Sequence, residues 1–250
     1  MSVGPRLGIQ LYTVRDLTGD DVFRSTLTTL AALGFEGVEF AWRYGGMQPD
    51  ELAAFLQSLG LACCGLHVQL EELLDPEHVV YDYARACGSL YITTSLCSRV
   101  EEWEDLLPQV SKAAAIAHNH GLQFTYHNHW QEFVRLGGSY ALDVMKEQTG
   151  PDLVQFELDL GWIKKAGEEP LDYWHTYSGR VPQIHLRDYD VEQDTVCDIG
   201  DGFIDLPVVA QQARAMGTEW LIYEQDAYPV SPLASAEVCV QRCRAAVLLA

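Results

Sequence analysis

The chain has 250 residues, with 16 Lys or Arg against 36 Asp or Glu, and a formal net charge of −20. Such an acidic surface repels phosphate backbones and keeps a protein in solution, which argues against a nucleic acid as substrate. No run of about 18 apolar residues occurs, so we expect no membrane-spanning segment.

Composition and the N-terminus predict the class and location of the protein. A hydrophobic content of 48% is ordinary for a globular chain with a substantial core. The first residues enter a predicted strand directly and lack the apolar run and cleavage site of a signal peptide, so we expect a cytoplasmic protein. The seven cysteines form no Cys-x-x-Cys pair, which favours buried, reduced thiols over a zinc cluster.

Short apolar runs alternate with amphipathic stretches along the whole chain, and glycine follows most of the amphipathic stretches, as is typical of helix ends. The predicted strands are 7–12, 37–41, 63–68, 90–94, 123–127, 154–159, 182–186 and 220–224. The predicted helices are 20–33, 50–59, 76–87, 100–120, 140–148, 171–177, 206–216 and 235–249.

Eight strand–helix units follow one another without a composition break or a low-complexity linker. Their alternation predicts a parallel sheet, and eight units at this length predict closure into a barrel. A doubly wound open sheet is the alternative, but no Gly-x-Gly-x-x-Gly motif follows the first strand. We therefore predict an α/β fold, a single (β/α)8 TIM barrel, with residues 1–250 forming one catalytic domain.

Polar side chains end most of the predicted strands, at the face where barrels of this type carry their active sites. These strand ends carry Glu39, His67, His127, Asp159, His185 and Glu224. Carboxylates and imidazoles that converge from separate strands suit a divalent cation such as manganese, cobalt, magnesium or zinc. Asp159, His185 and Glu224 end consecutive strands and should be neighbours. A fourth ligand should come from strand five or its loop, where His127, His129 and Glu132 are all candidates.

The most specific motifs are GFEGVE (34–39), YHNHWQEF (126–133), ELDLGW (157–162), HLRD (185–188), IGDG (199–202) and EQD (224–226). Over essentially the whole chain they resemble the sugar phosphate isomerase/epimerase family, the xylose isomerase-like TIM barrels. This family includes ketose 3-epimerases, hydroxypyruvate isomerase and inosose dehydratase. The resemblance implies the barrel fold and a metal-dependent reaction of a small carbohydrate.

The resemblance also implies a ligand set of Glu, Asp, His and Glu from strands five to eight, of which the last three correspond to Asp159, His185 and Glu224. At the strand-five place stands His127, and the nearest acid is Glu132. Because members with a His-Asn-His pattern typically keep that Glu, the resemblance assigns Glu132 as the fourth metal ligand, with His127 or His129 as the alternative. The ketose epimerases carry a His where this chain has Trp162.

The implied chemistry is the removal of a proton beside a carbonyl group, helped by a cation that stabilises the enediolate. Glu132 and Glu224 resemble the family's pair of acid/base residues, and His67 and His127 are the next candidates for proton transfer. The expected substrate-binding residues are Glu39, His129, Trp162, Lys165 and Arg187. Trp42 and Trp130 could supply further flat walls, with rim packing as the alternative.

We therefore expect a metal-dependent isomerase or epimerase. No basic cluster marks a phosphate pocket, so the expected substrate is a neutral sugar, keto-sugar or cyclitol. A dehydratase of the inosose dehydratase type is the first alternative and a non-catalytic sugar-binding barrel the second. The loop 200–202 could cradle an anion through its N–H groups or form a plain turn. Because family barrels often form dimers or tetramers, a homo-oligomer is one expected partner.

Overall fold

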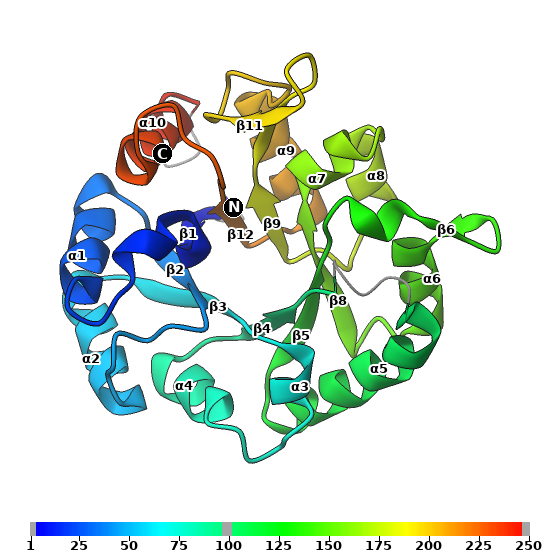
Figure 1. Ribbon diagram of the computed structural model, residues 1–250, viewed down its shortest axis with the longest axis horizontal. Helices are drawn as coiled ribbons and strands as arrows, with labels where there is room; N and C mark the ends of the chain where they lie inside the picture. Colours follow the sequence, from blue (N-terminus) through cyan, green and yellow to red (C-terminus); the bar gives the residue numbers. More distant parts are fainter. Residues whose placement is uncertain (1–3, 97–101, 247–250) are drawn as a thin grey trace.

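The computed structural model describes residues 4–96 and 102–246. Eight parallel strands close into a barrel in the order β1-β12-β9-β8-β5-β4-β3-β2, and helices surround it (Figure 1). The barrel strands are β1 (Arg6–Gln10), β2 (Gly37–Ala41), β3 (Ala62–His67), β4 (Tyr91–Thr94), β5 (Gln123–His127), β8 (Val154–Asp159), β9 (Gln183–Leu186) and β12 (Trp220–Tyr223). The predicted (β/α)8 barrel is confirmed.

The helices lie outside the barrel, and most end within one residue of the predicted end; the last was predicted to reach residue 249, which lies outside the described residues, but ends at Ala245. They are α1 (Phe23–Leu33), α2 (Pro49–Leu59), α3 (Leu70–Leu73), α4 (Val80–Cys87), α5 (Trp103–Asn119), α6 (Ala141–Gln148), α7 (Leu160–Lys165), α8 (Pro170–Thr176), α9 (Leu206–Met216) and α10 (Pro232–Ala245). Gly34, Gly60, Gly88 and Gly217 follow α1, α2, α4 and α9 with left-handed backbones, which supply the turn that stops each helix. None of the helices in the described ranges is long and apolar enough to cross a membrane.

Several short elements were not predicted from the sequence. They are α3, α7, the 3₁₀ helices η1 (Leu11–Leu17) and η3 (Gln131–Phe133), the hairpin of β6 (Arg135–Leu136) and β7 (Ser139–Tyr140), and the hairpin of β10 (Asp188–Asp190) and β11 (Thr195–Cys197). The first strand ends earlier than predicted because the Gln10 side chain accepts the N–H of Tyr12 and starts η1. The predicted helix start at residue 100 lies outside the described residues.

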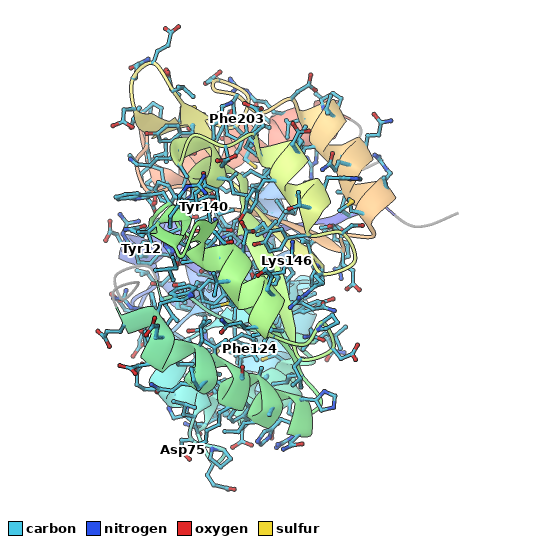
Figure 2. All side chains as sticks on the ribbon, turned by 90° about the vertical axis from the view of Figure 1, so that its right-hand side faces the viewer. Tyr12, Asp75, Phe124, Tyr140, Lys146 and Phe203 are labelled. Atoms are coloured by element: carbon cyan, nitrogen blue, oxygen red, sulfur yellow. The ribbon has the colours of Figure 1, made fainter. Side chains whose placement is uncertain are left out.

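The barrel interior changes character from its amino end to its carboxyl end. At the amino end it holds a small apolar cluster of Cys64, Tyr91, Trp220 and Ile222. Gly37 leaves room for this cluster, because a Cβ there would lie 2.7 Å from the Trp220 ring. Toward the carboxyl end the interior becomes polar. In the side view of Figure 2, Tyr12, which follows β1, lies at the left edge, so the carboxyl ends of the strands point that way.

Candidate active site and metal centre

Four buried side chains meet at the carboxyl ends of neighbouring strands. Asp159 ends β8 and is in register with His185 on β9, while Glu224 follows β12 and His127 ends β5. One ligand atom from each of these four residues lies within 4.8 Å of the others. The structure thus brings together Asp159, His185 and Glu224, and it places His127 beside them as the fourth residue.

Glu132, the expected fourth metal ligand and acid/base, is not among these four residues. Its fully buried carboxylate accepts the Tyr126 hydroxyl at 2.8 Å and the His129 N–H at 2.9 Å. These two bonds fold the loop after β5 back onto the strand, so the side chain stabilises the loop. Burial raises the pKa of Glu132 to about 7.

The four converging residues fit a divalent cation. Their donor set of imidazole nitrogens and carboxylate oxygens is the one that manganese, cobalt and zinc accept in proteins. His127 Nδ1 is buried and makes no hydrogen bond within the described protein, so it is available as a ligand. Ligand atoms lie roughly 2.0–2.2 Å from such an ion, and the four donor atoms, all within 4.8 Å of one another, are near enough to share one ion.

A buried guanidinium borders this candidate metal site. Arg187 Nε lies 2.7 Å from Asp159 Oδ2, Nη2 lies 2.8 Å from Glu224 Oε2 and Nη1 lies 2.5 Å from Asp226 Oδ2. The guanidinium also lies over the Trp162 ring, 4.3 Å from its centre. Arg187 therefore neutralises part of the carboxylate charge and holds these side chains in place. Asp226 was not predicted as a site residue, although its spacing of two from Glu224 was a usable signal.

Charge and burial set the protonation states around the metal centre. Burial raises the pKa of Asp159 to about 6 against the opposing charge of Arg187. For Glu224, burial acts in the same direction, but the charges of Arg187 and His185 outweigh it and lower the pKa below its usual range. For His185, burial is outweighed by the charges of Glu157, Glu224 and Glu39, which raise its pKa well above the usual value.

Three further imidazoles are neutral at pH 7. Burial lowers the pKa of His67, lowers that of His129 to about 3, and lowers that of His127 well below its usual value. The His67 and His127 rings are 5.3 Å apart, and those of His127 and His129 are 4.7 Å apart. A neutral imidazole can bind a metal, but a strongly lowered pKa makes it a weak proton acceptor at pH 7, so His127 and His129 are suited to binding rather than to proton transfer.

A second set of buried groups lies beneath the metal centre, on the other side of the His185 ring. Glu39 Oε2 lies 2.8 Å from His185 Nε2, and Glu157 Oε1 contacts the same nitrogen. Glu39 was expected to contact substrate, but it is fully buried and does not line the cavity above. Glu157 was not predicted at all. Its spacing of two from Asp159 puts both on one face of β8, and that signal was available.

The cavity above these residues has a volume of about 440 Å³ and opens at the carboxyl ends of the strands. Its lining is Gln10, Tyr12, Arg15, Ala41, Trp42, His67, Gln69, Leu70, Glu71, Ser95, Leu96, His127, His129, Trp162, Arg187, Glu224 and Asp226. Trp42 has a left-handed backbone with φ 59°, a conformation that costs energy for a bulky residue. It contacts Tyr12 edge-on at 5.9 Å. A hollow of about 530 Å³ at the amino ends of the strands contains none of the predicted site residues.

A protein-family model described as "Xylose isomerase-like TIM barrel" matches residues 27–239. The chain belongs to this family. An inosose dehydratase of Clostridium tetani (strain Massachusetts / E88) is 28% identical over 155 residues, 53% of this chain and 51% of that protein. The chain thus spans about half the length of the first curated relatives it matches. The match to inosose dehydratase of Clostridium botulinum (strain Alaska E43 / Type E3) is longer: 24% identity over 86% of this chain and 85% of that protein.

A solved structure from Parabacteroides distasonis ATCC 8503, described as a sugar phosphate isomerase/epimerase, has the same fold as this member of the xylose isomerase-like barrels. Its TM-score is 0.80, with 19% sequence identity, and the match covers 100% of this chain and 96% of that one. At this identity the likeness establishes the architecture alone.

Two other expectations for this xylose isomerase-like barrel concern residues that the structure places outside the cavity. Lys165 lies 5.4 to 5.9 Å from the rings of Trp130, Trp162 and Tyr189, and 3.8 Å from Asp194 at the turn between β10 and β11. It connects α7 to this hairpin. Trp130 lies at the rim and does not line the cavity.

The loop 200–202 does not offer free N–H groups to an anion. The N–H groups of Gly200 and Gly202 donate to Asp188 Oδ2 at 2.7 and 3.0 Å, and that of Ile204 donates to Asp188 Oδ1 at 3.1 Å. The buried carboxylate of Asp188 therefore fills the place that an anion would take. Of the two expectations for this loop, an anion-binding loop and a plain turn, the structure shows the plain turn.

Proposed function

We propose that this chain is a divalent-metal-dependent isomerase or epimerase, which removes a proton next to the carbonyl group of a small sugar, keto-sugar or cyclitol. One observation carries the proposal. Buried donor atoms of His127, Asp159, His185 and Glu224 converge at the floor of a cavity with the volume of a small-molecule site. A barrel that only bound a sugar would have no need of four such donors.

The metal ion would be held by His127, Asp159, His185 and Glu224. When bound, it supplies Lewis acidity toward a carbonyl oxygen and so acidifies the neighbouring C–H bond. His67 lines the cavity as a neutral imidazole and is the candidate to accept a proton at a ring nitrogen, whereas His129, with its pKa lowered to about 3, is suited to hydrogen-bonding a substrate hydroxyl. His67 and Glu224 reach the cavity from β3 and the end of β12, different sides of the barrel, as return of a proton to the opposite face requires.

The cavity wall supports a small and uncharged substrate. Its two arginines, Arg15 and Arg187, share the wall with Glu71, Glu224 and Asp226, so no excess of positive charge is available for a phosphate. Each of the three guanidinium nitrogens of Arg187 already contacts one of the protein's own carboxylates. Aromatic rings on the wall suit the apolar face of a sugar ring.

Dehydration of a keto-cyclitol is the second candidate. The observation that favours it is the name of the curated relatives in the two clostridia, inosose dehydratase. The same proton removal would begin the reaction, and a neighbouring hydroxyl would then leave as water. Trp162 also stands where the ketose epimerases carry a His, which favours the dehydratase over a ketose epimerase.

The test uses the metal content of the full chain purified without chelator, followed by incubation with keto-sugars and cyclitols in D₂O. We expect about one divalent ion per chain and deuterium uptake at the carbon beside the carbonyl, both lost in Asp159→Ala. A product lighter by one water marks dehydration, whereas isomerisation keeps every heavy atom. Absence of metal from the wild type, with no ion-dependent rise in melting temperature, would leave only the sugar-binding barrel.

We also propose that the enzyme works in the cytoplasm on a small free carbohydrate, without nucleic acid or membrane partners. A homo-oligomer and the extent of a single catalytic domain over residues 1–250 stay predictions.

A further inference from the structure

A polar cluster inside the barrel, formed by Glu39, Glu157 and His185, takes no part in lining the cavity. All three side chains are fully buried. Ligand atoms of the three lie within 4.8 Å of one another. Nearer the amino end of the strands the interior is apolar, so these charges are not required to fill a barrel of this width. Burying a carboxylate costs free energy of folding, so the presence of Glu39 and Glu157 here indicates that they serve a function.

The two nitrogens of the His185 ring face two different groups. Nδ1 points to the metal centre, 2.6 Å from Glu224 Oε2, whereas Nε2 points down the barrel to Glu39 and Glu157. A metal-binding histidine normally donates the N–H of its other nitrogen to a carboxylate or carbonyl, which fixes the tautomer and the ring orientation. The contacts at Nε2 match this arrangement.

Glu157 is held more firmly than Glu39. Thr93 donates its hydroxyl to Glu157 Oε2 at 3.0 Å, and Thr93 Oγ1 itself lies 2.7 Å from Thr125 Oγ1. Glu39 Oε2 is hydrogen-bonded to His185 Nε2 at 2.8 Å but has no second donor of this kind, and Oε1 of Glu39, like Oε1 of Glu157, makes no hydrogen bond within the described protein. The strand register also favours Glu157. Strands β8 and β9 are neighbours, and Asp159, two residues after Glu157 on β8, pairs with His185 on β9.

We propose that Glu157 is a positioning residue: by sharing the Nε2–H of His185 with Glu39 it directs Nδ1 toward the metal ion, with Thr93 holding the Glu157 carboxylate in place. This inference rests on the proposed function, since it needs His185 to be a metal ligand. The same three residues could instead hold a second cation. That cation would have to displace the Nε2 proton and share one imidazole with the first ion, so the geometry favours the positioning role.

The experiment measures Mn²⁺ binding by calorimetry, and the visible spectrum with Co²⁺, on full-length chelator-treated protein. For Glu157→Gln, which keeps the shape and removes the charge, we expect one ion per chain with affinity reduced roughly 10- to 100-fold, and a shifted Co²⁺ spectrum. Thr93→Val should weaken binding by less than about tenfold, since it disturbs His185 only through Glu157. Glu237→Gln, the same change at an exposed position on α10, should alter neither measurement.

The outcomes separate this inference from the proposed function. A wild-type chain that binds no ion overturns both. One ion in the wild type, with unchanged affinity and spectrum in Glu157→Gln, overturns the positioning role and leaves the proposed function intact. Two ions in the wild type would assign the cluster to a second cation, and a larger loss in Glu39→Gln would move the role to Glu39. If Glu157→Gln fails to fold, the graded loss in Thr93→Val still tests the proposal.

Discussion

The two faces of β8 carry side chains of opposite character. Val154, Phe156 and Leu158 point outward into the apolar layer beneath the helices, and all three are fully buried. Glu157 and Asp159 alternate with them, point inward, and are equally buried among charges and imidazoles. Burial is therefore the same on both faces, and only the chemistry of the neighbours differs.

The outer face of β8 stabilises the barrel, whereas its inner face carries the residues of the candidate site. Apolar side chains on the outer face gain free energy by leaving water, at about 25 cal/mol per Å². Carboxylates on the inner face lose their hydration and are compensated only by their contacts with His185 and Arg187. Burying the charges of the inner face lowers the stability of the fold, and the apolar burial on the outer face must offset this loss, as is usual for active sites.

The largest expected effect comes from the inner face. Asp159→Asn keeps the side-chain volume but removes a charged donor from the proposed metal centre, so we expect activity to fall at least about 1000-fold. The melting temperature without metal should fall, because the substitution removes the charge that Asp159 sets against Arg187 and leaves the buried guanidinium less compensated. Steady-state kinetics and calorimetric melting in EDTA check the two parts. Retention of metal and of near wild-type activity would mean that Asp159 is not a ligand.

Leu158, which precedes Asp159 and lies on the outer face, should behave differently: its substitution should lower stability and leave activity unchanged. Leu158→Ala leaves a cavity beneath the helices and should lower the free energy of unfolding by about 2–5 kcal/mol, as for other buried leucines. Metal affinity and activity should stay close to wild type at a temperature where the variant is folded. Urea unfolding and kinetics at 15 °C or another low temperature measure both. A loss of activity without a loss of stability would show that the two faces are not independent.

Glu132 sharpens the comparison, because it is a buried carboxylate without a cation beside it. Burial raises its folded pKa to about 7, above an unfolded value of about 4.3, so the fold favours the protonated acid. The associated stability is present below about pH 4.3 and is lost as the pH rises through 7. We expect the wild type to lose on the order of 3 kcal/mol over this range relative to Glu132→Gln. Urea titrations of both proteins in EDTA at pH 5 and pH 8 give the difference, and parallel pH profiles would refute it.

Much of the fold followed from the sequence, because strand–helix alternation and helix-ending glycines are local signals. The convergence of Asp159, His185 and Glu224 was also accessible, since parallel strands bring their carboxyl ends together. Glu132 was misplaced for a physical reason: its carboxylate is captured by Tyr126 and by the His129 N–H, and no spacing rule shows which way a loop side chain turns. Contacts across the barrel, such as Glu39 with His185, depend on its closure and lie 146 positions apart in the chain.

The smallest expected effect concerns the loop 198–205, which precedes α9. A Cβ on Gly202 would lie 2.4 Å from Asp188 Oδ1 and 2.6 Å from the Tyr189 carbonyl oxygen, so Gly202→Ala must push the loop off its carboxylate. We expect a loss of about 1–3 kcal/mol in the free energy of unfolding. Gly150→Ala, at a position with open space around the added Cβ, is the matched control and should be near neutral. Equal effects of the two substitutions in urea unfolding would mean that Asp188 does not hold this loop.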